Sequence, residues 1–111
     1  MAVLKSIPME RVIAGKTIST SEITMVTDSE YTSSGECLII TKENSQITIF
    51  LDETTTDHII IKSLVPTKIR PKNGKIDEEF RELNIEKGAS VELYFSFGNW
   101  YIVSSDGIKE Q

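Results

Sequence analysis

The chain has 111 residues and a net charge of −5. That length is sufficient for one domain around one hydrophobic core. The negative charge argues against a nucleic-acid partner, which requires a basic stripe, and against an anionic membrane surface. No apolar run is long enough to span a bilayer. The single cysteine, Cys37, cannot form an intramolecular disulfide, so we expect synthesis in a reducing cytoplasm.

Residues 1–30 differ in character from the rest of the chain. They contain few large apolar side chains and many serines and threonines. Short apolar stretches at residues 12–13 and 23–26 fit edge strands of the main domain. Alternatively, the segment is an extended arm that attaches to a neighbouring subunit or a larger assembly. We predict a boundary after residue 30, with a β domain over residues 31–111.

Short runs of β-forming residues follow at spacings of roughly ten residues. The first four expected strands are residues 36–41, 46–51, 58–63 and 67–70. The fourth lies between Pro66 and Pro71, which suits an edge strand or a strand end. No internal repeat is visible. The pattern predicts an all-β fold: a single small antiparallel β-sandwich or barrel-like domain, with the N-terminal extended arm.

The segment at residues 77–88 fits two structures. Asp77 would serve as a helix N-cap and Gly88 as a C-terminal glycine, which favours a helix. Residues 81–85 alternate between apolar or long side chains and polar ones, which favours a strand. Periodicity alone does not decide so short a run. We favour a strand over residues 81–85.

Residues 89–104 predict a β-hairpin that closes the core. Its apolar positions are Val91, Leu93 and Phe95 in the first strand and Trp100 and Ile102 in the second. A loop of two residues (97–98 or 98–99) or of four (96–99) places both sets on one side, whereas a three-residue loop separates them. Gly98 tolerates the positive φ of a tight turn. We expect Trp100 at the centre of the buried face.

No set of side chains predicts a reaction. His58 is the only histidine and Cys37 the only cysteine, so neither has partners at metal-ligand spacing. Asp52, Glu53 and Asp57 lie in an acidic loop that matches no EF-hand. We therefore predict no catalytic, cofactor-binding or metal-binding residues, no cofactor, and a protein that is not an enzyme.

Two groups of side chains are candidates for contact with a partner. Tyr94 and Tyr101 fall on the strand face opposite Trp100, and with Phe97 they would contact a protein or stack on a sugar ring. The second group is a local basic cluster that would receive an acidic partner surface or would protect an edge strand. It consists of Lys62, Lys68, Arg70, Lys72 and Lys75.

From Tyr31 onward, the order of elements resembles a recurring small β domain of tailed-bacteriophage virion proteins. The matching segments are residues 46–52 (ITIFLD and its preceding Gln), 59–62, 69–77 and 88–104. The most specific segment is the last, GASVELYFSFGNWYIVS, where relatives read like SVTLVSDGTNWYVI. The chain departs from the family pattern at residues 95–98, where FSFG replaces a polar turn. It also carries Glu78 and Glu79 where a glycine is common.

The resemblance implies a bacteriophage virion structural protein, made in the host cytoplasm and located in the virion. It would be a capsid-decorating or fibre-anchoring module that acts by protein–protein binding to other capsid, tail or fibre proteins. It would also form a homo-oligomer, with a trimer favoured. The alternative is a carbohydrate-binding, receptor-recognition module of a phage tail or fibre that uses Tyr94, Phe97 and Tyr101.

Overall fold

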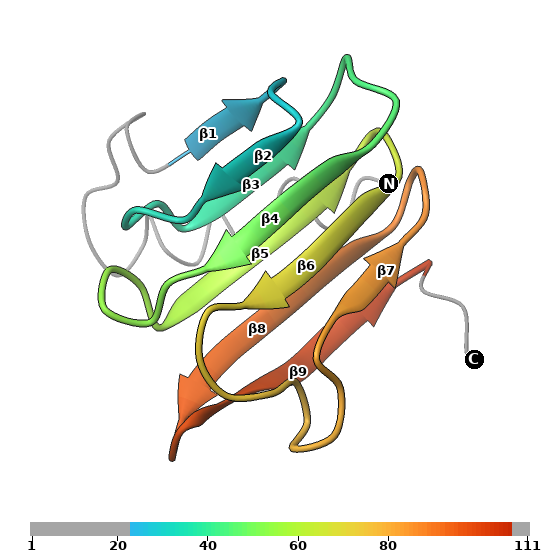
Figure 1. The fold of residues 1–111 in the computed structure, drawn as a ribbon. Helices are drawn as coiled ribbons and strands as arrows, with labels where there is room; N and C mark the ends of the chain where they lie inside the picture. The colour runs from blue at the N-terminus through green and yellow to red at the C-terminus, as the bar shows by residue number, and fades with distance from the viewer. Residues whose placement is uncertain (1–22, 108–111) are drawn as a thin grey trace, which may run out of the picture.

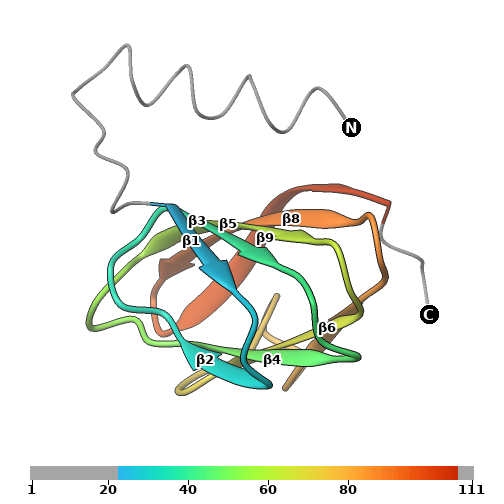
Figure 2. The same ribbon diagram turned by 90° about the horizontal axis from the view of Figure 1, so that it is seen from above.

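The computed structural model describes residues 23–107, which form nine β-strands and no helix (Figure 1). The larger sheet has the order β1-β3-β5-β8-β9 and the smaller one β2-β4-β6-β7. The larger sheet contains β1 (Ile23–Val26), β3 (Leu38–Thr41), β5 (His58–Ser63), β8 (Ser90–Ser96) and β9 (Asn99–Asp106). The smaller sheet contains β2 (Glu30–Thr32), β4 (Ile47–Leu51), β6 (Thr67–Pro71) and β7 (Leu83–Ile85). Figure 2 shows the two sheets as separate layers.

The chain alternates between the two layers from β1 to β6. Consecutive strands of each layer therefore run in the same direction, and β1–β3, β3–β5, β2–β4 and β4–β6 are parallel pairs. The antiparallel pairs are β5–β8, β6–β7 and β8–β9. The all-β prediction is confirmed, but the prediction of antiparallel sheets is wrong for the first six strands. The physical reason is that the chain crosses to the other sheet after each strand. It therefore returns to the first sheet at the same end, and its next strand there runs parallel to the previous one. Each sheet keeps two edge strands, so neither is a closed barrel.

The parallel pairs stack apolar side chains on one another in rows. Ile39 lies in register with Ile61 in one sheet, and Ile49 with Ile69 in the other. The spacing along the chain varies, however, because Leu38 follows its partner Ile23 by 15 positions whereas Ile60 follows Leu38 by 22. The regular succession of parallel strands in each sheet is therefore not visible as a fixed period in the sequence.

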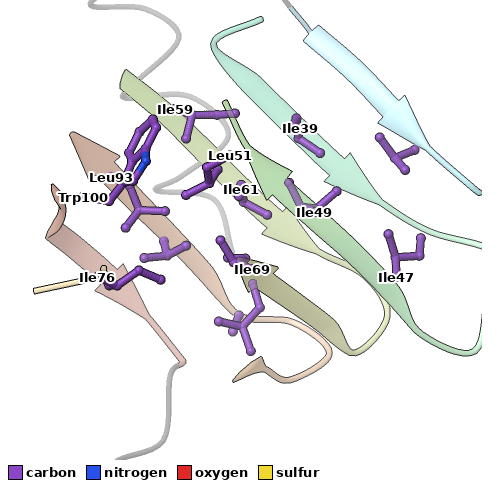
Figure 3. Packing of buried hydrophobic residues seen from close by; sticks show 14 residues of the cluster. Ile39, Ile47, Ile49, Leu51, Ile59, Ile61, Ile69, Ile76, Leu93 and Trp100 are labelled. Atoms are coloured by element: carbon purple, nitrogen blue, oxygen red, sulfur yellow. The ribbon is translucent and has the colours of Figure 1, made fainter. Parts of the chain in front are cut away.

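The hydrophobic core lies between the two sheets (Figure 3). Trp100 is its largest side chain and is fully buried, as the sequence predicted. The other members are mostly isoleucine, leucine and valine from both sheets, and burial of one such side chain contributes about 1.5–3 kcal/mol. The cluster comprises Val26, Ile39, Ile47, Ile49, Leu51, Ile59, Ile61, Ile69, Ile76, Ile85, Ala89, Val91, Leu93 and Trp100.

The closing hairpin has the shorter of the predicted loops. Ser96 pairs with Asn99, so Phe97 and Gly98 form a two-residue turn with φ angles of 51° and 84°. Positive φ at both central residues is the geometry that fits the twist of a hairpin. The register shifts between Glu92 and Leu93, which leaves Val103 as the extra residue of a bulge.

Two further sequence predictions are resolved. Residues 77–88 contain the strand β7 and no helix, so the strand interpretation is confirmed over Leu83–Ile85. Of the two positions that the prolines suggested for β6, the strand end is confirmed: β6 is an inner strand of its sheet, and Pro71 is its last residue. Between residues 23 and 107 there is no helix long and apolar enough to cross a membrane.

The predicted N-terminal arm falls partly within the described structure. Ile23–Val26 is an edge strand paired with β3, and Val26 belongs to the core. β2 was not expected, because Glu30–Thr32 carries no apolar alternation. Residues 1–22 and 108–111 lie outside the described residues, and the boundary after residue 30 stays a prediction.

Candidate functional site

A strained turn precedes β7. The amide of Glu79 donates to the carbonyl of Ile76 at 3.1 Å, and the two residues between them, Asp77 and Glu78, have φ angles of 53° and 63°. Glycine and asparagine favour this backbone region, whereas other side chains are held there at a cost of about 1–3 kcal/mol. The turn therefore holds two acidic side chains, Asp77 and Glu78, in a backbone conformation that their residue types disfavour.

Backbone bonds hold the segment before this turn against the edge of β9. The amide of Trp100 donates to the carbonyl of Lys75 at 2.8 Å, and the amide of Asp77 donates to the carbonyl of Trp100 at 2.7 Å. The Asp77 carboxylate then accepts from the amide of Ile102 at 3.0 Å. These bonds cover the first half of the β9 edge and fix the segment relative to the hairpin.

The hairpin tip and the segment enclose an open hollow of about 440 Å³. Its lining is polar and contains two cations and one carboxylate; the residues are Gly74, Lys75, Glu78, Arg81 and Asn99. Asn99 accepts from the amide of Lys75 at 2.8 Å, which ties the two walls together. The Tyr101 hydroxyl donates to Glu78 Oε2 at 2.7 Å. This bond to the Glu78 carboxylate is the main cause that raises the pKa of Tyr101.

Two phenylalanines are exposed near the hollow. Phe97, at the hairpin turn beside Asn99, is 95% exposed, and Phe80, just before Arg81, is 45% exposed. Both side chains are available for contact with a protein partner, because aromatic residues are enriched at protein interfaces. We call the hollow together with Phe80 and Phe97 the tip surface.

The two predicted tyrosines lie side by side on the outer face of the larger sheet. Tyr94 and Tyr101 are directly paired across β8 and β9. One ring face of Tyr94 stacks on His58, with centroids 4.1 Å apart and planes inclined by 6°. His58 Nε2 in turn lies 2.6 Å from Glu92 Oε2. Tyr94 therefore offers one ring face to a ligand, whereas Phe97 is exposed on all sides at the turn.

The structure does not bring the five predicted cations together. Lys62 lies in the larger sheet and donates to the carbonyl of Gly88 at 3.0 Å. The others belong to β6 and the segment after it. Lys68 and Arg70 each lie 3.7 Å from Glu82, so an acidic residue of the same chain already neutralises part of their charge. Lys75 alone belongs to the tip surface.

Hydrogen bonds within the acidic loop after β4 hold its conformation. Asp52 Oδ1 accepts from the hydroxyl of Thr54 at 2.6 Å and from its amide at 3.0 Å. These bonds, together with Lys72 at 3.8 Å, lower the pKa of Asp52. Between residues 23 and 107, no three or more histidine, cysteine, aspartate or glutamate side chains group as metal ligands would.

Sequence reasoning missed three of the hollow's side chains. Arg81 was considered only as part of the ambiguous segment 77–88, and Asn99 only as a loop residue. Glu78 was considered in that segment and as a departure from the pattern that the chain resembles, but not as part of a site. Arg81 carried no signal, because its position depends on the turn before it. No known family model matches the chain, and no curated protein matches its sequence.

Proposed function

We propose that this protein is a structural component of a bacteriophage virion, a capsid-decorating or fibre-anchoring module that works by binding other virion proteins. The observation that carries the proposal is the exposure of Phe97 on a turn whose backbone is fixed. A large aromatic side chain that is exposed in the free domain contributes strongly to affinity when it is buried in a partner's pocket.

A second surface supports the proposed self-association. Met25 is 56% exposed and lies in register with Ile40 on the outer face of the larger sheet. Ile23 occupies the same face at the sheet edge, in register with the buried Leu38. An exposed apolar side chain at an edge strand suits contact with further copies of the chain. The preference for a trimer comes from the resemblance to the phage domains alone.

The test combines oligomeric state with particle binding. We expect light scattering after size-exclusion chromatography to give an oligomer, and we expect the protein to bind virions that were produced without it. Phe97→Ser should weaken that binding at least about tenfold. Val103→Ser is the control, because Val103 is also exposed but lies at the bulge away from the turn. A monomer without affinity for the particles would overturn the proposal.

A carbohydrate-binding receptor-recognition module is the second candidate function. Tyr94 keeps one ring face open, and the hollow beside Tyr101 is lined by groups that hydrogen-bond to sugar hydroxyls. A glycan array tests this function, with Tyr94→Ala as the variant expected to lose the signal. No binding to any glycan, or equal binding by the variant, would remove this candidate.

A further inference from the structure

The cations of the hollow differ from most others in the described structure. Lys42, Lys68, Arg70 and Lys72 form ion pairs, and Lys62 donates to a carbonyl. Lys75 and Arg81 have no ion-pair partner among residues 23–107 although the chain is acidic overall. Two unpaired cations thus face one hollow.

The carboxylate within the hollow does not neutralise these cations by contact. Glu78 instead accepts from the hydroxyl of Tyr101 at 2.7 Å, and neither Lys75 nor Arg81 forms an ion pair with it. The ionisable side chains of the lining therefore carry a net positive charge, in a protein whose total charge is −5. A local excess of positive charge of this kind favours a small anionic group over a long polyanion, which the rest of the surface repels.

We propose that the hollow binds the carboxylate of an acidic side chain on a partner protein, with Lys75 and Arg81 as the groups that hold it. Arginine pairs with a carboxylate through two parallel hydrogen bonds, and lysine adds a point charge. Phe97, two residues before the lining residue Asn99 in the sequence, is exposed and would supply an apolar contact to the same partner. The inference rests on the proposed function and adds the chemistry of the partner: an acidic residue next to an apolar pocket.

The lining favours an acidic peptide over a sugar. A sugar-binding hollow typically presents an aromatic ring on which the apolar face of the sugar stacks. The residues that line this hollow are glycine, lysine, glutamate, arginine and asparagine, with no ring among them. Phe97 is fully exposed at the turn rather than part of the hollow's lining.

A peptide titration of the full ¹⁵N-labelled chain tests the inference. The probes are acetyl-Gly-Glu-Leu-Glu-Gly-amide, the same peptide with glutamine in place of glutamate, and methyl glucuronide. We expect the glutamate peptide to shift the amide signals of Gly74, Lys75 and Asn99, with an affinity that falls as salt is added. The double variant K75Q/R81Q should bind it at least about tenfold more weakly.

Lys87→Gln is the matched control, because Lys87 is exposed and unpaired in the described structure but does not line the hollow. It should leave peptide affinity unchanged. Equal shifts with the glutamine peptide, equal affinity of the double variant, or binding of the glucuronide alone would each overturn the inference. Virion binding that persists in K75Q/R81Q but is lost in Phe97→Ser would leave the proposed function intact while the inference fails.

Discussion

Gly74 lies so close to Gly98 that a Cβ atom on Gly74 would be 2.0 Å from the Gly98 carbonyl oxygen. Backbone therefore packs directly on backbone where the segment before β7 meets the closing hairpin. Because Gly74 also has a φ of 77°, both its conformation and its surroundings require glycine. This contact joins the two halves of the tip surface directly through their backbones.

Gly74→Ala should lower the free energy of unfolding by about 3 kcal/mol or more, since the methyl group clashes and the positive φ is strained. Gly88→Ala is the control. Gly88 has a φ of 92°, but a Cβ there would meet no atom within 4 Å. It should cost about 1–2 kcal/mol from strain alone. Urea denaturation measures both, and equal costs would show that the Gly74–Gly98 contact is not tight.

Trp100 offers a second test, directed at the core. Trp100→Ala should cost about 3–5 kcal/mol, because it leaves a cavity between the sheets. The indole Nε1 is buried and has no hydrogen-bond partner within the described structure. Trp100→Phe loses no hydrogen bond and should therefore cost less than Trp100→Ala, about 1–2 kcal/mol. If the phenylalanine variant proved as unstable as the alanine variant, the indole nitrogen would have to be bonded in solution.

Acid should weaken the fold partly through Asp52. Hydrogen bonds from Thr54 lower the pKa of Asp52 below its ordinary value, so this group stabilises the folded state above its unfolded pKa. That contribution is lost as the pH falls through the lowered pKa. Carboxyl-carbon NMR measures the titration directly. Thr54→Ala should raise the Asp52 pKa more than Lys72→Gln does, because the side-chain hydrogen bond outweighs the charge of Lys72. The reverse order would contradict the assignment.

Alkaline pH should act through Tyr101. Its hydrogen bond to Glu78 raises the pKa of Tyr101, so the neutral phenol stabilises the folded state below the unfolded pKa. This contribution is lost as the pH rises through the raised pKa. Tyr101→Phe should flatten stability against pH in the alkaline range, because it removes the phenol whose pKa is raised. Phenolate absorbance during titration, compared with urea midpoints, measures this, and an unchanged pH dependence in Tyr101→Phe would contradict the prediction.

Much of the strand content followed from the sequence. Alternating side chains fixed which faces of β4 and of the hairpin are buried, and the even-loop argument placed Trp100 and Leu93 on one side. Such patterns are local, so they need no knowledge of pairing partners. The two-residue turn Phe97-Gly98 was one of three loops that met this condition, and the structure selects it.

The parallel pairing did not follow from the sequence. Alternation states which face of a strand is buried but not which strand lies beside it, and the crossings between sheets vary in length. The residues that form the tip surface could not be predicted from the sequence either. Arg81 reaches the hollow only because Asp77 and Glu78 adopt positive φ angles, a conformation that their residue types disfavour. Three-dimensional placement of loop side chains depends on such exceptions.

Trp100 belongs to the last strand of the described structure, and this position has a consequence for folding during synthesis. On one side β5 pairs with β3, which is close to it in the sequence. On the other side it pairs with β8, and two strands of the smaller sheet lie between β5 and β8 in the sequence. When only the first six strands have left the ribosome, the hydrophobic core still lacks Trp100, its largest side chain, and is exposed. Completion of the fold must therefore wait for the last strands to be synthesised, because β8 and β9 supply one side of the larger sheet.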